Sequence, residues 1–208
     1  MKLKFDPNQQ YQLDAINAVV NIFAGQPKDS DGATCHIDQD RQLSLEATIA
    51  RGNSLVLDVA QITENMRAVQ QQNDILPDEN DLTDEPSTVE NLPHGMNFSV
   101  EMETGTGKTY VYLRTIHELY QHYSWKKFII VVPSIAIREG VLKNLEITRE
   151  HFADLYNKPE MNYYVWDSKK TSQAREFATN DTLQIMVITI DSFAKAQNVM
   201  NRQSDYGR

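Results

Sequence analysis

Apolar residues recur at helical spacing in the first part of the chain. The apolar face is formed by Tyr11, Ala15, Val19 and Phe23, with Ile16 and Val20 beside them. Asp6 is a candidate helix cap, Pro7 suits a first helical position, and Gly25 is a stop signal. The pattern therefore predicts a helix that begins at Pro7 and ends at Gly25.

The next stretch changes to short apolar runs separated by turn residues. It predicts strands at Thr34–Ile37, Leu43–Leu45 and Ser54–Leu57, which together suggest a small antiparallel insert. Asp58 then caps a helix that runs to about Gln72. Residues 73–93 are polar, acidic and proline-bearing, and we expect a mobile loop there.

From Phe98 onward, the pattern alternates between strands and helices. A short strand beginning at Phe98 leads through a glycine loop into a helix over about 107–120. Further strands are expected at Lys127–Val132, Met161–Trp166 and Leu183–Ile190, with helices at about Ile135, at Glu146–Tyr156 and at Lys169–Phe177. The first and last of these strands are continuous apolar runs, which predicts parallel strands covered on both faces. The order indicates an α/β fold with right-handed crossovers.

Charge is distributed unevenly along the 208 residues. The net charge is −9, but residues 68–107 hold nine acidic residues and no Lys or Arg. Removing those nine from the 29 acidic residues leaves 20, against 20 Lys and Arg. The acidity is therefore a local property and does not argue against nucleic-acid binding elsewhere.

Composition sets the expected compartment. The single cysteine, Cys35, cannot form an internal disulfide and fits a reducing, cytoplasmic environment. The N-terminus lacks the form of a signal peptide. The longest apolar run, Phe128 to Val132, is too short to span a bilayer. We expect a cytoplasmic protein with no membrane partner.

The glycine loop has the chemistry of a phosphate-binding site. It comprises Thr104, Gly105, Thr106, Gly107, Lys108 and Thr109. The glycines let backbone N–H groups approach an anion, and the helix that follows points its partially positive end at the same place. Lys108 can reach the β- and γ-phosphates of ATP, and the Thr109 hydroxyl can ligate Mg²⁺. Met102 stands where the full P-loop pattern has glycine.

Three segments together resemble motifs I, Ia and Ib of superfamily 2 helicases, and in particular the Res subunit of type III restriction enzymes. They are Glu101-Met-Glu-Thr-Gly-Thr-Gly-Lys-Thr-Tyr110, Val131-Val-Pro-Ser-Ile-Ala-Ile-Arg-Glu-Gly-Val141 and Ile188-Thr-Ile-Asp-Ser-Phe193. The helix containing Tyr11 and Gln12 resembles the Q motif. The resemblance implies a three-layer RecA-like P-loop domain with a mostly parallel sheet that carries a small insert. It divides the chain into an N-terminal helix at 1–25, an insert at 26–93 and the first part of the RecA-like domain at 94–208.

The same resemblance implies roles for individual residues. Residues 104–109 would bind ATP, with Lys108 acting on the β/γ-phosphates and Thr109 on Mg²⁺, and Gln12 would recognise adenine. The residues alone favour a solvent-facing side chain for Gln12. Pro133, Ser134, Ile135, Arg138 and Thr189 would follow one strand of double-stranded DNA. Ser134 is also well placed to be a plain helix cap.

The family also carries features that these residues do not show. Motif II, an apolar strand ending in Asp-Glu-x-His, is expected after motif Ib and does not occur here. The second RecA-like domain and the nuclease are also missing. We therefore expect an N-terminal fragment with negligible ATPase activity by itself. The complete protein would be an ATP-dependent type III site-specific deoxyribonuclease that works with a methyltransferase and recognition (Mod) subunit.

A different class of function fits part of the sequence. The apolar run Ile185–Asp191 could be a Walker B strand, with Asp191 near Mg²⁺ in a self-contained P-loop phosphotransferase. Such an enzyme needs an acceptor site and lid arginines, which the sequence does not identify. Loss of Mg²⁺-nucleotide binding on mutation of Asp191 would distinguish this alternative from the motor.

Overall fold

The computed structural model describes residues 4–28, 33–37, 48–75, 97–167 and 171–194. The chain forms two compact units. One contains residues 6–27 and 55–118, and the other contains residues 1–5, 28–54 and 119–208. The boundary at 118 falls within helix α3 (Lys108–Tyr123). The boundaries after residues 25 and 93, which the resemblance implies, describe segments of the sequence and differ from the boundaries of these two units. They stay a prediction.

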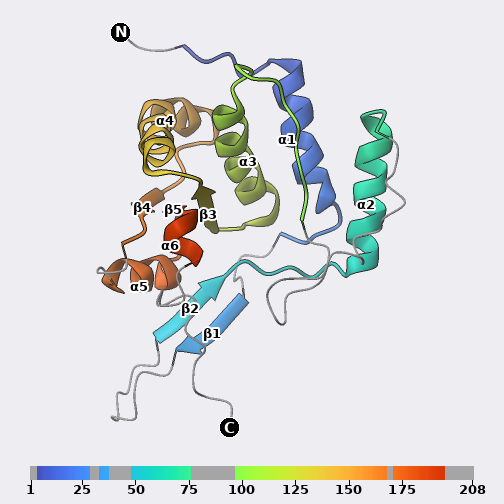
Figure 1. The fold of residues 1–208 in the computed structure, drawn as a ribbon. Helices are drawn as coiled ribbons and strands as arrows, with labels where there is room; N and C mark the ends of the chain where they lie inside the picture. The colour runs from blue at the N-terminus through green and yellow to red at the C-terminus, as the bar shows by residue number, and fades with distance from the viewer. Residues whose placement is uncertain (1–3, 29–32, 38–47, 76–96, 168–170, 195–208) are drawn as a thin grey trace. The chain divides into compact units, whose positions relative to one another are not determined.

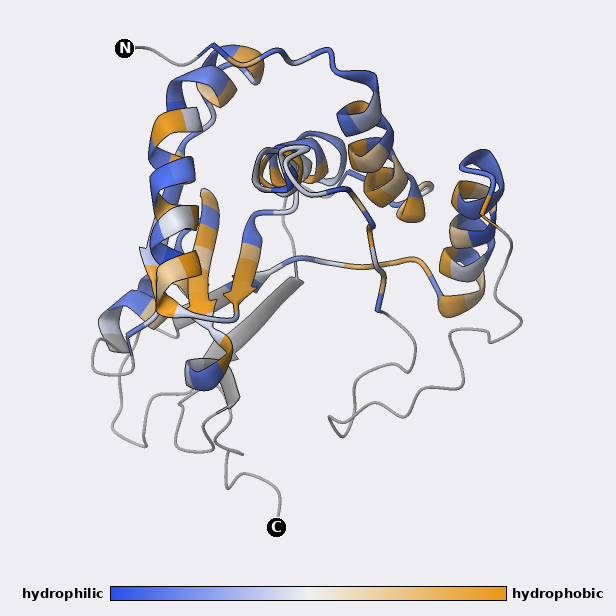
Figure 2. Ribbon diagram, turned by 45° about the horizontal axis from the view of Figure 1, so that its top comes forward, coloured by the Kyte–Doolittle hydropathy of each residue, from blue (hydrophilic) through white to orange (hydrophobic). Residues whose placement is uncertain are grey.

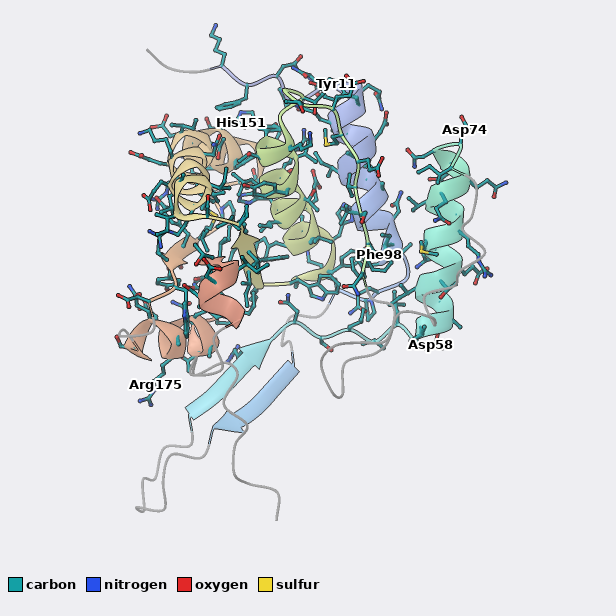
Figure 3. All side chains as sticks on the ribbon, in the orientation of Figure 1. Tyr11, Asp58, Asp74, Phe98, His151 and Arg175 are labelled. Atoms are coloured by element: carbon teal, nitrogen blue, oxygen red, sulfur yellow. The ribbon has the colours of Figure 1, made fainter. Side chains whose placement is uncertain are left out.

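The first unit is built from helices. It holds α1 (Gln10–Ile22), α2 (Val59–Gln72) and the first part of α3. Asp58 caps α2 as predicted, by accepting from the Gln61 backbone N–H at 2.8 Å. Asn65 of α2 donates its side-chain amide to the carbonyls of Ile22 and Ala24 at 3.0 and 2.9 Å, which binds the end of α1 to α2. The labelled Asp58 lies at the start of α2 in Figure 3.

Two predictions in this unit are wrong in detail. Helix α1 begins at Gln10 and not at Pro7, because the Asp6 carboxylate accepts from the nearby Asn8 N–H at 2.9 Å in a local turn. Residues 97–103 have no strand assignment, and no described strand pairs with them, although their apolar character predicted one. Strand formation needs a pairing partner, which local sequence does not specify.

The second unit contains a parallel sheet of three strands in the order β3-β5-β4: β3 (Lys127–Val132), β5 (Leu183–Thr189) and β4 (Met161–Val165). Both neighbours of β5 pair with it in parallel. Helices α4 (Ile135–Leu155) and α5 (Thr171–Thr179) connect the strands, and a short α6 (Ile190–Ala194) follows β5. The chain moves along the sheet in opposite directions in the two crossovers, so right-handed connections place α4 and α5 on opposite faces. The predicted α/β architecture is confirmed.

Strands β3 and β5 are hydrophobic along most of their length (Figure 2), but they differ in burial. Every residue of β5 is buried, as predicted. The prediction of two covered faces is wrong for β3, because Ile129 and Val131 are 42% and 45% exposed. Their register partners Met186 and Ile188 form a core cluster with Trp166, Ala174 and Phe177. Helix α5 packs against β5, and it leaves this face of β3, at the edge of the sheet, open.

Helix α4 is a single element where two helices were predicted. Its buried residues Val141, Leu145, Thr148 and Phe152 keep one continuous stripe at helical spacing. That stripe gives the helix a reason to continue through the expected break before Glu146.

The predicted strand at Thr34–Ile37 is confirmed as β1 (Ala33–Ile37). It forms an antiparallel hairpin with β2 (Thr48–Gly52), a strand that the sequence pattern did not predict, and Cys35 lies opposite Ala50 (Figure 1). The strand expected at Ser54–Leu57 is not formed, because its backbone groups bond to side chains. The Ser54 carbonyl accepts from the Trp125 indole and the Val56 N–H donates to Gln26. The predicted strand at 43–45, and the predicted loop from residue 76 to 93, lie outside the described residues.

Candidate nucleotide-binding site

The glycine loop turns sharply just before α3. Gly105 and Gly107 have φ of +84° and +85°, in the left-handed region that favours glycine. The Thr106 hydroxyl donates to the Glu103 carbonyl at 2.7 Å and closes the turn. A methyl group added at Gly105 would meet nothing within 4 Å, so the backbone there faces open space. The loop is therefore shaped so that a ligand can approach its main chain.

Lys108 is the first residue of α3 and folds back over the loop. Its ammonium donates to the Glu103 carbonyl at 2.7 Å, the same oxygen that Thr106 uses. That acceptor is a neutral carbonyl, and the lysine is exposed. A phosphate oxygen is a stronger acceptor for an ammonium than a neutral carbonyl is. Lys108 could therefore give up the Glu103 carbonyl and bind a phosphate oxygen instead.

The start of α3 has no side-chain cap from the residue before it, because that residue is Gly107. The first backbone N–H groups of a helix have no partner within the helix and favour anions. The Thr109 hydroxyl lies in the first turn and bonds to the Tyr112 phenol. Burial raises the pKa of Tyr112, and this hydrogen bond opposes the shift. The Thr109 hydroxyl therefore lies near the loop and is hydrogen-bonded to a neutral phenol, that of Tyr112.

Gln12 of α1 contacts the loop directly. It is 8% exposed, and its Nε2 donates to the Thr106 carbonyl at 2.9 Å. A Cβ atom added at Gly107 would lie 2.8 Å from the same Nε2. The glutamine is thus packed against the loop. The interpretation of Gln12 as a solvent-facing side chain is therefore wrong. Recognition of adenine by Gln12 stays a prediction.

The body of α3 is buried and supports the loop. Arg114 is 8% exposed; it donates to the Pro7 carbonyl at 2.5 Å and pairs with Glu118 at 3.6 Å. His117 is 3% exposed, and burial lowers its pKa to about 4, so the imidazole is neutral at neutral pH. Neutral or paired polar groups of this kind are compatible with a buried helix. The loop is therefore attached to a well-packed element.

A groove of about 1330 Å³ lies beside the loop, between α1, α2 and residues 97–103. Tyr11 and Thr106 line it near the loop, and Phe98 lines it toward the other end of α1 (Figure 3). Its lining also includes the acidic residues Asp14, Glu101 and Glu103. Carboxylates disfavour a polyphosphate in the groove itself. The backbone cradle at 104–109 is the better place for phosphate.

The predicted DNA-contacting residues lie around the carboxyl ends of β3 and β5. Ser134 caps α4 by accepting from the Ile137 N–H at 3.3 Å. Arg138 donates from Nε and Nη2 to one carboxylate oxygen of Glu139, at 3.1 and 2.8 Å. Thr189 is 7% exposed, and its hydroxyl donates to Ser192 at 2.9 Å. Of this set, Pro133, Ser134 and Ile135 are exposed, and the polar groups of Arg138 and Thr189 already have partners.

Comparison with known proteins identifies the family. The family model for the Res subunit of type III restriction enzymes matches residues 7–208. The chain belongs to the type III Res subunit family. It is 31% identical to the EcoPI Res subunit of Escherichia phage P1 over 196 residues, which covers 93% of this chain and 17% of that protein. The EcoP15I Res subunit of Escherichia coli gives 31% identity over 195 residues, with the same two coverages.

A third relative matches over a shorter span. The StyLTI Res subunit of Salmonella typhimurium is 48% identical over 67 residues, which covers 31% of this chain and 7% of that protein. The chain thus spans less than a fifth of the length of the curated relatives with the longest matches. The resemblance inferred from the three motifs is confirmed at the level of the family, together with a helicase-like α/β fold. In the part of the chain that the structure describes, no helix is long and apolar enough to cross a membrane.

The Res family match disfavours the phosphotransferase alternative. Asp191 itself lies in α6, two residues after β5 ends, and is exposed. Sequence reasoning missed one participant of the loop, the Glu103 carbonyl that holds both Lys108 and Thr106. A backbone oxygen leaves no signal in the identity of its residue, so only the structure could reveal it.

Proposed function

We propose that this chain is the nucleotide-binding part of an ATP-dependent, helicase-like restriction subunit. The observation that carries the proposal is the glycine loop, whose open main chain directly precedes Lys108 at the uncapped start of α3. Residues 104–109 would hold the ATP phosphates, with Lys108 on the β/γ-phosphates and Thr109 on Mg²⁺. Bound Mg-ATP would supply the free energy of phosphoryl transfer to the motor.

The remaining roles are proposed for a polypeptide as long as the relatives. It would act on double-stranded DNA, moving along it or switching state on it at the expense of ATP. Pro133, Ser134, Arg138 and Thr189 would contribute to the DNA face. The relatives are named as Res subunits of type III restriction-modification enzymes, and we propose a methyltransferase and recognition (Mod) subunit as the partner. DNA cleavage belongs to the same proposal.

Equilibrium binding of a fluorescent ATP analogue with Mg²⁺ tests the nucleotide site. Lys108→Ala removes a charge-assisted hydrogen bond worth about 1.5–3 kcal/mol, so the affinity should fall about 10- to 150-fold. Lys143→Ala is the control, because that lysine is 67% exposed and pairs with Glu146 on α4. Equal affinity of both variants would refute the site. Binding is the readout because these 208 residues hold no Asp-Glu-x-His box after motif Ib.

The same assay separates two roles for Gln12. If Gln12 recognises adenine, Gln12→Ala should weaken ATP binding and leave GTP binding nearly unchanged. If the glutamine only positions the loop through Thr106, both nucleotides should be weakened alike. The ratio of the two affinities therefore decides between recognition and positioning.

A further inference from the structure

Three basic side chains converge at the amino end of the parallel sheet. Arg51 lies in β2, Lys126 precedes β3 and Lys127 is the first residue of β3. Arg51 and Lys126 both bind the Oδ1 atom of Asp181, at 2.8 and 3.0 Å. We call Arg51, Lys126 and Lys127 the amino-end cluster. All three, and Asp181, belong to the same compact unit.

The backbone that presents the cluster is fixed in place. The Asn53 side chain accepts from the N–H groups of Lys126 and Lys127 at 2.8 and 3.0 Å, and donates to the Lys127 carbonyl at 2.7 Å. The Trp125 indole donates to the Ser54 carbonyl at 2.9 Å. These bonds pin the end of the hairpin to the start of β3. The basic side chains therefore start from a defined backbone, which lowers the entropy cost of holding a ligand.

Lys127 is placed between a polar and an aromatic neighbour. Its ammonium donates to the Asn180 carbonyl and lies 5.6 Å from the centre of the Phe177 ring. Burial lowers the pKa of Lys127 to about 8, and the charges of Lys126 and Arg51 add to the effect while Asp181 opposes it. The pKa of Asp181 is below its usual value, because hydrogen bonds from Lys126 and Arg51 outweigh the effect of burial. The three basic side chains and Asp181 are thus close enough to influence one another's charge.

Arg51 and Lys126 bind the same carboxylate oxygen of Asp181, and Lys127 binds a neutral carbonyl beside them. Like charges held this close repel one another, and a polyanion would relieve the repulsion. Arg51 and Asp181 have 39% and 51% of their side-chain surface exposed, so a ligand can reach them. We propose that the amino-end cluster is a second binding site for nucleic-acid phosphate, separate from the residues predicted to contact DNA.

The position of the cluster supports a separate site. It lies at the start of β3, whereas Pro133 and Ser134 follow the end of that strand. Six residues of strand span about 20 Å, so the two places cannot hold the same phosphate. Phosphate contacts of this kind fix position and carry no sequence information. The choice of DNA over an acidic polypeptide rests on the proposed function, whereas the anion site itself does not.

Binding of a fluorescently labelled duplex of arbitrary sequence, followed by anisotropy, tests the site. The triple variant Arg51→Gln/Lys126→Gln/Lys127→Gln should weaken binding at least about tenfold at low salt. The dependence of log affinity on log salt between about 50 and 200 mM should lose about two to three units of slope. The control Lys143→Gln/Arg149→Gln/Lys158→Gln removes the same charge from exposed positions of the same unit. Equal affinity and slope in both triple variants would overturn the proposal.

A second variant guards against a loss caused by misfolding. Asp181→Asn removes the competing carboxylate and should tighten duplex binding several-fold, a gain that an unfolded protein cannot give. Unchanged or weaker binding by Asp181→Asn would count against the site. Competition with polyglutamate of matched charge tests the ligand class, and tighter binding of polyglutamate than of DNA would reject nucleic acid. ATP binding to the triple variant should be unchanged, so failure here is distinct from failure at Lys108.

Discussion

Helices α3 and α4 both follow a motif that the sequence marks as functional, but they begin in different ways. The residue before α3 is Gly107, which has no side chain to cap the helix, and the loop around it is open. The residue before α4 is Ser134, whose hydroxyl caps the Ile137 N–H. An uncapped start can accept an anion directly, whereas a capped start must first give up an internal hydrogen bond. The comparison supports the proposal that phosphate binds at the start of α3, and it gives Ser134 a structural role at the start of α4.

The largest expected effect concerns the buried body of α3, whose stability should decrease at acidic pH. The folded pKa of His117 is about 4, below the ordinary 6.5, so the unfolded chain takes up this proton first as pH falls. The His117 contribution to stability is therefore present above pH 6.5 and is lost as pH falls toward 4, by at most about 3 kcal/mol. Urea unfolding of the chain at pH 7 and pH 5 measures the loss.

His117→Gln should remove this part of the acid sensitivity. His122→Gln is the matched control, since His122 is exposed on the same helix. The quantity to compare is the difference in unfolding free energy between the two pH values for each variant. If His117→Gln loses as much stability on acidification as the control, burial of this imidazole does not govern the acid response of α3.

The two glycines of the loop provide the next largest effect. An alanine at either position must adopt a left-handed conformation, at a cost of about 1–2 kcal/mol. At Gly107 the new Cβ would also displace Gln12 from the Thr106 carbonyl, which adds about 1 kcal/mol for a lost hydrogen bond. Gly107→Ala should thus destabilise the chain more than Gly105→Ala in urea unfolding. Equal losses would mean that the Gln12 contact does not stabilise the loop.

The start of α4 should respond differently. Ser134→Ala removes a cap worth about 1 kcal/mol, whereas Ser134→Asp keeps a capping oxygen and adds a charge that helix starts favour. If Ser134 also contacts a DNA phosphate, Ser134→Asp should keep stability and weaken duplex binding, because the aspartate repels phosphate. Thermal unfolding and duplex anisotropy on the same samples separate the two roles. Unchanged DNA binding by Ser134→Asp would leave the cap as the role of this residue.

What the sequence could predict depended on how local the cause was. The glycine loop, the Asp58 cap and the apolar strand β5 follow from residues within a few positions of one another, and the structure agrees with each. The exposure of Ile129 and Val131 follows from where α5 packs, and the missing strand at 97–103 from the lack of a described partner. The contact of Gln12 with the loop joins residues 94 positions apart. Such effects depend on tertiary packing, which periodicity does not report.

The smallest expected effect concerns Arg138, the basic residue near the start of α4. Its guanidinium is bound to Glu139 next to it, in an exposed pair that contributes at most about 1 kcal/mol to stability. Glu139→Gln should therefore change stability little. If Arg138 can turn to DNA, the variant should tighten duplex binding a few-fold at low salt, and the gain should vanish at high salt because exposed charges are screened. The double variant Glu139→Gln/Arg138→Gln is the control, and a gain that survives in it would show that the removed acid, and not the freed arginine, is responsible.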